Sequence, residues 1–338
     1  MNKTVSIIIP CRNEEKYIEK CILSIIHSNF PQELLTVYVC DGMSDDNTRS
    51  VIEKISQQYP QVKLLDNLKK TTPFALNLGL KTSSDDIKII LGAHSEIDKD
   101  FIIENVKAFE IDEKIGCTGG VIENVYEDET SKIIGLAMSS SFGVGNAHFR
   151  TGNKDGFVDT VAFGAYDKKV FDSIGYFDEA LTRNQDDEFN FRLIKNNFKI
   201  FLSHKIKCKY YVRGTFDKLF KQYYQYGYWK VFVNKKHKTV TTIRQLIPLF
   251  FVMFLFFGII VSFINTYLLY GFLVILGVYF ILAILASLKF KINTVKKVKL
   301  IYAFLILHLS YGIGYFNGMI DFLLLNKNPT EKNTELTR

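Results

Sequence analysis

Side chains that could bind a cation or accept a proton stand at the ends of apolar runs in this sequence. Asp41 follows one such run, His94 follows another, and Asp186 opens a segment with helical spacing. A carboxylate can act as a general base, and carboxylate or imidazole groups can hold a divalent cation. These residues are far apart in the chain, so their chemistry depends on the elements that bring them together.

Apolar runs alternate with amphipathic segments over the first hundred residues. Such alternation is typical of an α/β domain with a mostly parallel sheet, whose ligands bind beyond the carboxyl ends of the strands. We therefore expect Asp41 and His94 to face one crevice. The pattern predicts strands at 5–9, 35–42, 62–67 and 86–94, and helices at 14–29, 45–59 and 73–83.

The pattern is coarser farther along the chain. Residues 115–125 predict a strand and a turn, and residues 163–165 a turn of small residues before a short helix. Residues 184–202 predict a helix with an acidic start, followed by a strand.

The composition divides the chain into a soluble part and a membrane part. Of the 338 residues, 48% are apolar, and the excess is concentrated after residue 244. A membrane span needs about 20 apolar residues, and three segments are long enough. They cover 246–264, 267–288 and 300–325, the last of which contains His308 and Asp321. We expect a soluble domain at 1–235, a membrane domain at 236–325 and a polar tail at 326–338.

Charge predicts the orientation in the membrane. The loop at 289–299 contains five lysines, which places it in the cytoplasm by the positive-inside rule. The apolar run before Pro10 is too short for a secretory signal, which agrees with a cytoplasmic first domain. A spanning third segment would put the tail outside, whereas a re-entrant or interfacial segment would keep it inside. We expect a multi-pass protein of the cell membrane.

Two other classes of protein are disfavoured. The cysteines are odd in number and form no C-x-x-C pair, so we expect reduced, buried thiols and neither disulfides nor a structural zinc site. The net charge of +7 does not indicate nucleic acid, because the soluble part has no basic stripe interleaved with aromatics. The cysteines are Cys11, Cys21, Cys40, Cys117 and Cys208.

Five motifs occur in an order that resembles a known family. They are VSIIIPCRNEEKYIEKCILSI, VCDGMSDDNT, FALNLGL, the 92–96 stretch and NQDDEFNFRL. Over about residues 4–235 the chain resembles the inverting family-2 glycosyltransferases of the GT-A fold. Its apolar C-terminal segments are similar to those of succinoglycan-type glucosyltransferases of exopolysaccharide synthesis. The resemblance implies a Rossmann-like domain that binds a nucleotide sugar.

The resemblance assigns the first motifs to the donor. It implies that Lys70 and Asn77 approach the donor beside a helix N-terminus, which would favour a diphosphate. A solvated loop and an exposed helix face are the alternative for these two residues, and an ordinary Asp-Gly turn is the alternative at position 41. The residues implied to line the nucleotide pocket are Pro10, Arg12, Asn13, Glu14, Asp41 and Gly42.

The 92–96 stretch departs from the family pattern in one position. The family's acidic motif usually begins with Asp and ends with Asp or, in some members, His; here the two positions are Gly92 and His94. The resemblance implies that His94 contacts a divalent cation or the diphosphate, with Mn²⁺ favoured over Mg²⁺ because imidazole suits Mg²⁺ poorly. A plain polar residue at a strand end is the alternative.

The resemblance also implies a base. Gln185-Asp186 occupies the position where Glu-Asp is usual, with the Asp taking the proton of the acceptor hydroxyl as it attacks the anomeric carbon from the far side. Such a displacement inverts the stereochemistry. Asp187 would lie beside it in the substrate site. The alternative is that these acids only favour a helix N-terminus.

The acceptor side is the least specific part. Gly119, Gly120 and residues 163–164 are expected to shape it, and Arg213 and Lys218 could meet the phosphates of a lipid carrier. Gln222 and Trp229 loosely match a Gln-x-x-Arg-Trp element of related enzymes. An aromatic belt at the membrane interface accounts for the same stretch and is favoured.

The expected activity is transfer of a hexose from a nucleoside-diphosphate sugar, with UDP as the expected nucleotide, to a growing glycan on a polyprenyl carrier. The product would feed exopolysaccharide, capsule or a similar polymer, with export left to other assembly proteins. One alternative is direct transfer to polyprenyl phosphate. Another is a non-catalytic membrane scaffold that binds nucleotide sugars, which Gly92 and Gln185 would favour.

Overall fold

The computed structural model describes residues 3–145, 147–152, 155–212, 214–241 and 243–327, and the chain divides into two compact units. The first unit is Met1–Val125 with Ala147–Tyr211, and the second is Tyr126–Asn146 with Val212–Arg338. The units therefore divide at Val212, whereas the predicted boundary after residue 235 falls inside helix α10 (Phe216–His237).

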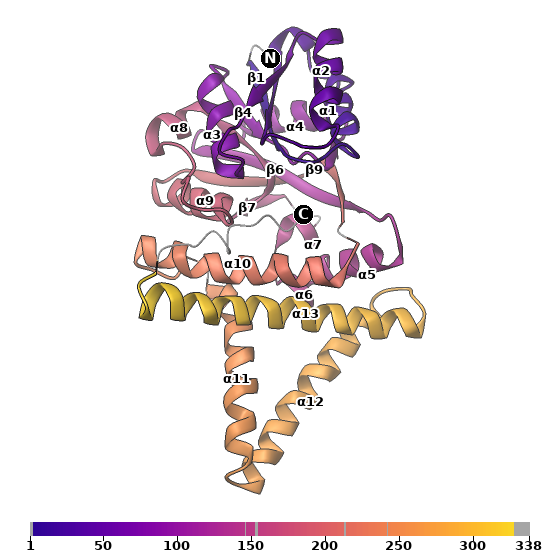
Figure 1. Ribbon diagram of the computed structural model, residues 1–338, viewed down its shortest axis with the longest axis vertical. Coiled ribbons are helices and arrows are strands. Elements are labelled where there is room, and N and C mark those ends of the chain that lie inside the picture. Colours follow the sequence, from indigo (N-terminus) through magenta and orange to yellow (C-terminus); the bar gives the residue numbers. More distant parts are fainter. Residues whose placement is uncertain (1–2, 146, 153–154, 213, 242, 328–338) are drawn as a thin grey trace. The chain divides into compact units, whose positions relative to one another are not determined.

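The described part of the first unit contains one sheet of nine strands (Figure 1). The order is β3-β2-β1-β4-β8-β6-β9-β5, and β7 pairs with β9. The strands are β1 Val5–Cys11, β2 Leu35–Asp41, β3 Val62–Asp66, β4 Ile87–Ile90, β5 Ser95–Ile97, β6 Ile115–Val125, β7 Gly156–Val158, β8 Ala162–Asp167 and β9 Lys199–Tyr211.

The sheet is parallel where the sequence pattern is regular and mixed elsewhere. Strands β3, β2, β1 and β4 are parallel neighbours, as predicted. Strand β8 runs antiparallel to both β4 and β6, which corrects the prediction of a turn at 163–165. The small residues there serve packing, because a Cβ on Gly164 would lie 2.9 Å from Cys117 Sγ.

Helices cover both faces of this sheet. Alternate side chains of β1 point to opposite faces, so Ile7 and Ile9 enter one core and Ile8 the other. Helices α1 (Ile18–Ile26), α2 (Thr48–Gln58) and α4 (Phe101–Ala108) pack on the first face. Helices α3 (Thr72–Thr82), α8 (Lys168–Ile174) and α9 (Gln185–Lys195) pack on the second. All five cysteines are buried and free, as expected.

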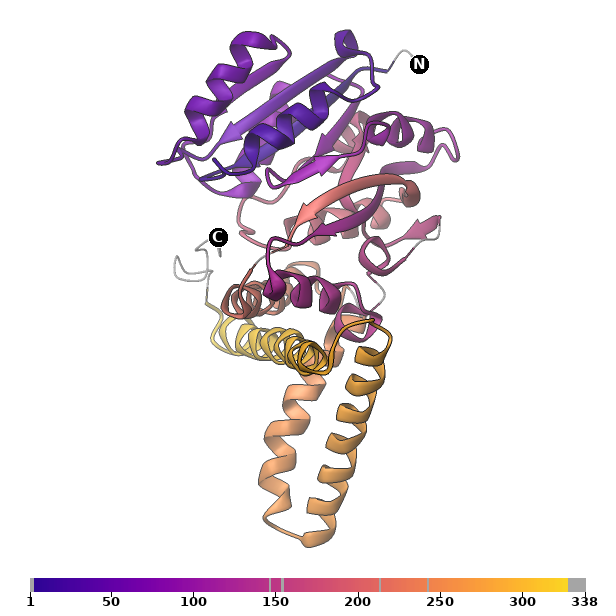
Figure 2. The ribbon, with the colours of Figure 1, turned by 90° about the vertical axis from the view of Figure 1, so that its right-hand side faces the viewer.

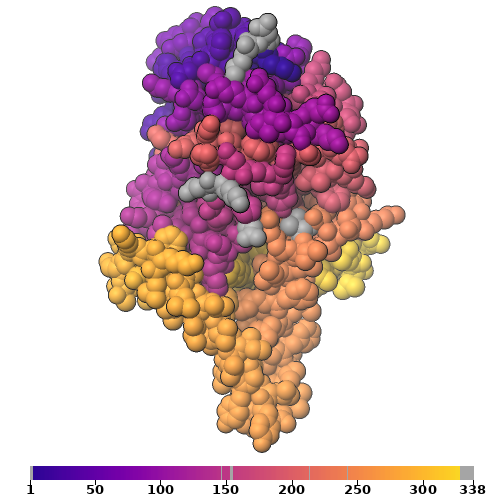
Figure 3. All heavy atoms as spheres, turned by 180° about the vertical axis from the view of Figure 1, so that it is seen from behind, coloured from indigo at the N-terminus to yellow at the C-terminus, as the bar shows by residue number. Residues whose placement is uncertain are grey.

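In the second unit, two long helices lie side by side, and a helical hairpin projects away from them at a steep angle (Figures 1 and 2). The pair is α10 with α13 (Thr294–Gly318), which continues as a π-helical turn at Met319–Leu324. The hairpin is α11 (Ile247–Ser262) and α12 (Thr266–Leu288), and it stands out clearly in Figure 3. Helices α5 (Glu129–Met138) and α6 (Ser141–Val144) pack on α13.

Three helices of the described chain are long and apolar enough to cross a membrane, but they differ in burial. The windows in the two hairpin helices are 6% buried, whereas the window in the third is 56% buried. Glycines explain this burial: a Cβ on Gly314 would lie 2.0 Å from Tyr224 O, and one on Gly227 2.0 Å from Tyr311 O. The backbones of α10 and α13 therefore touch, as small residues allow.

Candidate active site

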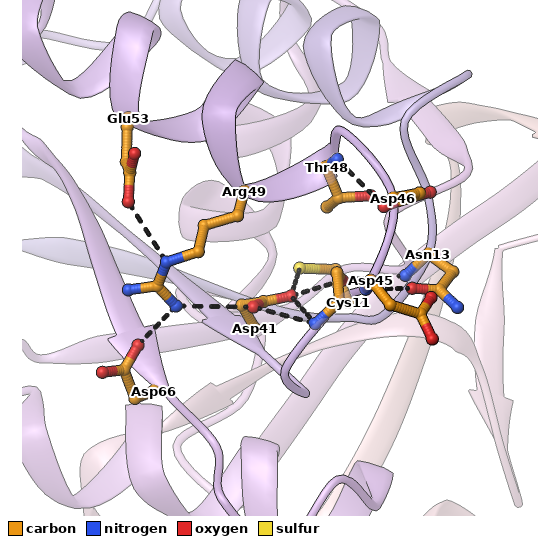
Figure 4. A network of polar contacts seen from close by, with 10 residues as sticks. Cys11, Asn13, Asp41, Asp45, Asp46, Thr48, Arg49, Glu53 and Asp66 are labelled. Atoms are coloured by element: carbon orange, nitrogen blue, oxygen red, sulfur yellow. Dashed lines mark hydrogen bonds and ion pairs between the residues drawn. The ribbon is translucent and has the colours of Figure 1, made fainter.

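The loops that follow β1 and β2 hold each other (Figure 4). The Asn13 N–H donates to Ser44 Oγ at 2.9 Å, and Asn13 Oδ1 accepts from the Asp45 N–H at 3.0 Å. The Glu14 N–H donates to Thr48 Oγ1 at 2.7 Å. Asn13 has a φ of 55°, a left-handed conformation that Asn tolerates better than most residues. Two predicted site residues are thus fixed at the carboxyl edge of the sheet.

Asp41 ends β2, which lies between β3 and β1, and is fully buried. Its carboxylate accepts from Ser44 Oγ at 2.5 Å and from the Ser44 N–H at 3.2 Å. Arg49 Nη1 lies 3.6 Å from Asp41 Oδ2 and donates to Asp66 Oδ1, at the end of β3, at 2.7 Å. A buried charge needs such partners. Sequence reasoning missed Arg49, although its position just after the start of the second predicted helix put it at this edge.

The loop after β3 joins the same edge. The Asn67 N–H donates to Asp41 O at 2.8 Å, and its amide donates to Thr71 O at 2.9 Å. This places the exposed Lys70 beside the loop after β2, with a φ of 61°. Asn77 is buried instead, and its amide nitrogen donates to Phe177 O at 2.9 Å and to Glu179 Oε1 at 2.8 Å. Contact of either predicted residue with the donor stays a prediction.

The structure gives a steric reason for glycine at position 92. A Cβ there would lie 3.1 Å from Cε1 of Phe163, so the Phe163 ring occupies the side-chain space of the family's first Asp. Phe163 itself has a φ of 49°, a costly conformation for an aromatic residue. The Gly92 carbonyl accepts from Ser95 Oγ, which closes the turn after β4.

His94 meets the first loop directly. Its Nδ1 lies 3.6 Å from Glu14 Oε1, and its ring packs edge-on against Tyr210 with centroids 5.1 Å apart. No group of three or more His, Cys, Asp or Glu side chains among the described residues could hold a metal ion. The contact of His94 with a cation or a diphosphate therefore stays a prediction, and Glu14 is the acidic side chain nearest to its Nδ1 among the described contacts.

Asp186 lies at the same edge of the sheet by the register of the strands. Helix α9 leads into β9, whose first residue, Lys199, pairs with Ile115 at the start of β6. Through β6 and β8, the register puts this end of β9 at the amino ends of β4 and β1. The first turn of α9 therefore lies at the carboxyl edge. The Asn190 amide supports this, since it donates to Thr160 Oγ1 at 3.2 Å just before β8.

The acids of α9 differ in their surroundings. Asp186 is exposed, and its Oδ1 accepts from the Asp187 N–H at 2.9 Å. Glu188 is fully buried and paired with Arg192 at 2.9 Å, which excludes it as a base in contact with substrate. Asp187 is half-buried, and its contact with substrate stays a prediction.

Two predicted site residues carry buried polar atoms without a hydrogen-bond partner in the described chain. They are Arg12 Nε and Gln185 Oε1. Such an atom costs about 1–3 kcal/mol and calls for an explanation, such as a ligand absent from the structure. Pro10 and Gly42 flank the same loops, and a Cβ on Gly42 would lie 3.2 Å from Arg12 Cβ.

Other predicted residues have structural surroundings. A Cβ on Gly120 would lie 1.7 Å from Ile206 O, so this glycine is required by strand packing. Trp229 is fully buried in the second unit against Phe232 and Phe322, and its substrate contact stays a prediction.

Three further residues are predicted on the acceptor side. Gln222 is buried and donates to Tyr226 Oη at 2.8 Å, and its substrate contact stays a prediction. Lys218 is exposed in the first turn of α10. Arg213 lies outside the described residues.

Parallel strands end in loops that bond to each other around a buried carboxylate at the carboxyl edge of the sheet. This arrangement is typical of transferase domains that use nucleotide sugars. The chain belongs to glycosyl transferase family 2, whose family model matches residues 6–175. It is a glycosyltransferase, and the alternative of a non-catalytic scaffold is set aside.

Relatives share most of its length. The chain is 30% identical over 324 residues, 94% of this chain and 97% of the relative, to the dolichyl N-acetyl-α-D-glucosaminyl phosphate 3-β-D-2,3-diacetamido-2,3-dideoxy-β-D-glucuronosyltransferase of Methanococcus voltae. It is 28% identical over 248 residues, 72% of this chain and 74% of the relative, to the succinoglycan biosynthesis protein ExoA of Rhizobium meliloti.

A solved structure confirms the GT-A type of fold. The mannosyltransferase PcManGT of Pyrobaculum calidifontis, in complex with GDP-mannose and Mn²⁺, has a TM-score of 0.52 at 18% identity. The match covers 66% of this chain and 62% of the mannosyltransferase, so this chain spans less than two thirds of that protein's length.

Proposed function

We propose that the chain transfers a hexose from a UDP-sugar to a lipid-linked glycan, with inversion at the anomeric carbon. The observation that carries the proposal is the buried Asp41 carboxylate, which the loops after three strands enclose at the carboxyl edge of the sheet. A lipid-linked acceptor is supported by the name of the full-length relative, which acts on a dolichyl-linked sugar.

In this proposal Asp186 is the general base. Its carboxylate is exposed at the edge that carries Asp41 and His94, and Glu188, the third acid of the same turn, is committed to Arg192. A base in this place would take the proton of the acceptor hydroxyl as the sugar–phosphate bond breaks. The nucleoside diphosphate would leave with the electron pair of that bond.

A divalent cation would be held by Glu14 and His94 together with diphosphate oxygens. When bound, it would stabilise the negative charge of the leaving diphosphate. Two donors 3.6 Å apart are compatible with one ion after a small movement, and a nitrogen donor favours Mn²⁺ over Mg²⁺.

The second unit would hold the enzyme on the membrane through two spans and two interfacial helices. Helix α12 has 23 residues, long enough for a hydrocarbon core of about 30 Å. Helix α13 packs along α10, which carries Asp217, Lys221 and Lys235 and therefore belongs outside the hydrocarbon core. We place α10 and α13 in the cytoplasmic interface, which keeps the C-terminal tail inside.

The test is a donor panel. Purified chain in lipid nanodiscs receives radiolabelled UDP- and GDP-sugars, Mn²⁺ and lipid extracts that contain polyprenyl-linked glycans. The proposal expects label in a lipid-linked product from a UDP-hexose, with inverted configuration by NMR. Label on polyprenyl phosphate alone would favour the direct-transfer alternative. Turnover only with GDP-sugars, or retained configuration, would contradict the proposal.

A further inference from the structure

Arg150 carries a buried, unsatisfied hydrogen-bond donor close to the candidate site. It lies on the short helix α7 (His148–Thr151), and its Nη1 atom is buried without a hydrogen-bond partner in the described chain. The guanidinium carbon lies 5.3 Å from the ring centroid of Phe149 and 5.6 Å from that of Tyr210. These contacts hold the guanidinium in place through cation–π attraction without using its hydrogen-bond donors.

Tyr210 connects Arg150 to the candidate metal site. The Tyr210 ring that contacts the guanidinium also packs edge-on against His94, with centroids 5.1 Å apart. Tyr210 is fixed in β9 opposite Ser95, and the next N–H, that of Tyr211, donates to His94 O at 3.3 Å. One aromatic ring therefore separates Arg150 from the side chain that would hold the cation and diphosphate.

We propose that Arg150 binds a phosphate oxygen of a substrate, an inference that rests on the proposed function. A guanidinium cannot lose its charge and presents donors in a fork that matches phosphate, so an anion is the ligand that satisfies it. Described carboxylates form no ion pair with Arg150, which leaves its charge for a ligand. The phosphate comes either from the donor diphosphate or from the lipid-linked acceptor.

The test compares Arg150→Gln with Arg150→Lys, and with Lys205→Gln as a control that removes an exposed charge from β9. Calorimetry in nanodiscs measures the affinities for UDP, uridine, inorganic pyrophosphate and a short polyprenyl phosphate. A lost charge-assisted hydrogen bond weakens binding roughly tenfold or more.

Each outcome decides the inference. Weaker UDP and pyrophosphate binding in Arg150→Gln, with unchanged uridine binding, assigns the donor diphosphate. Weaker polyprenyl phosphate binding alone assigns the acceptor. A folded Arg150→Gln variant with wild-type affinity for all phosphate probes overturns the inference, as does wild-type affinity of a folded Arg150→Met variant if the Gln variant does not fold.

The measurement with inorganic pyrophosphate distinguishes a failure of this inference from a failure of the proposed function. A wild-type chain that binds pyrophosphate but neither UDP nor uridine would contradict the proposed donor. The loss of pyrophosphate binding in Arg150→Gln would still support the anion contact. A wild-type chain that binds no phosphate probe overturns both.

Discussion

The hydroxyl of Ser44 donates to the Asp41 carboxylate across 2.5 Å, at the point where β2 ends. The same oxygen accepts from the Asn13 N–H at 2.9 Å, so one hydroxyl joins the loops after β1 and β2. The position of the buried carboxylate and the shape of the first loop are thereby coupled. The Ser44 hydroxyl therefore contacts both loops at the edge of the candidate nucleotide pocket.

Ser44→Ala should therefore impair both stability and nucleotide binding. Loss of the two hydrogen bonds of this hydroxyl should lower the free energy of unfolding by about 1–3 kcal/mol. UDP affinity should fall about tenfold, because Asp41 and Asn13 lose their common partner. Thermal unfolding and calorimetry measure the two effects. Ser50→Ala is the control, since the Ser50 hydroxyl bonds only to Asn47 O among the described contacts. Wild-type UDP affinity in Ser44→Ala would contradict the coupling.

Local sequence patterns predict the strands and helices around Ser44 and Asp41. The short apolar run before Pro10 and the helical spacing at 14–29 predicted β1 and α1, and the parallel order placed Asp41 at the carboxyl edge. Arg49 was missed because its partners, Asp41 and Asp66, are brought together only by the register of β2 and β3. Long-range pairing of this kind leaves no local pattern in the chain.

In the mixed half of the sheet, too, the sequence pattern does not predict which strands pair. Gly164 and its neighbours predicted a turn because small residues are common in turns, but close contact with Cys117 requires the same residues in a strand. In the second unit, glycines of the third apolar segment look like ordinary membrane-helix residues. Their role becomes clear only when Gly314 meets Tyr224 of α10. Glycines in the sequence therefore indicate close packing, but they do not indicate which segment they pack against.

Asp46, in the loop after β2, should make the stability of the fold depend on pH. Burial raises the pKa of this carboxyl, but hydrogen bonds from Thr48 and Glu15 outweigh burial and hold its pKa below the ordinary value of 3.8. A lowered pKa stabilises the fold above the unfolded-state pKa, and this contribution is lost as the pH falls through the folded value. Asp46→Asn should lower Tm at about pH 6, and the difference should shrink as the pH falls below the ordinary value of 3.8 and vanish once the pH is below the folded-state pKa.

The control for this pH dependence is Asp45→Asn, which removes an exposed neighbouring carboxylate. Thermal unfolding of the purified variants across the pH range measures the difference. A deficit in Asp46→Asn that stays constant down to about pH 2 would show that its cause is not ionisation.

Asp186→Asn should abolish turnover and spare nucleotide binding. A positioned base contributes about 10²–10⁴-fold, so kcat should fall by that factor while the Kd for UDP stays within about twofold. Asp172→Asn, an exposed carboxylate on α8, is the control. Radiolabel transfer and calorimetry give the two values. Turnover of Asp186→Asn at the wild-type rate would remove the base from the mechanism.

Gly314→Ala should loosen the second unit. The new Cβ would lie 2.0 Å from Tyr224 O, a backbone atom that a rotamer change cannot move away. Overpacking of this kind costs about 1–3 kcal/mol, and Tm should fall by several degrees. Gly277→Ala on α12 is the matched control, because a Cβ there meets nothing within 4 Å. Equal Tm values for the two variants would contradict the proposed backbone contact.

The membrane arrangement predicts on which side three introduced thiols react. The native cysteines are buried, so an impermeant maleimide should report mainly on the new ones. Asn265→Cys lies between α11 and α12, Lys297→Cys in the first turn of α13 and Lys327→Cys beyond its π-helical end.

If only the hairpin spans, the thiols at positions 297 and 327 react from the cytoplasmic side and the thiol at 265 from the opposite side. The reason is that α13 shares its length with the charged helix α10, and its glycines bring the two backbones into contact. If α13 crossed the membrane, α10 and its lysines would also enter the hydrocarbon core, because the two helices pack together. This would cost about 2.5–3.5 kcal/mol or more for each charge. Labelling of positions 265 and 327 from one side, with 297 on the other, would establish a third span and refute the interfacial assignment.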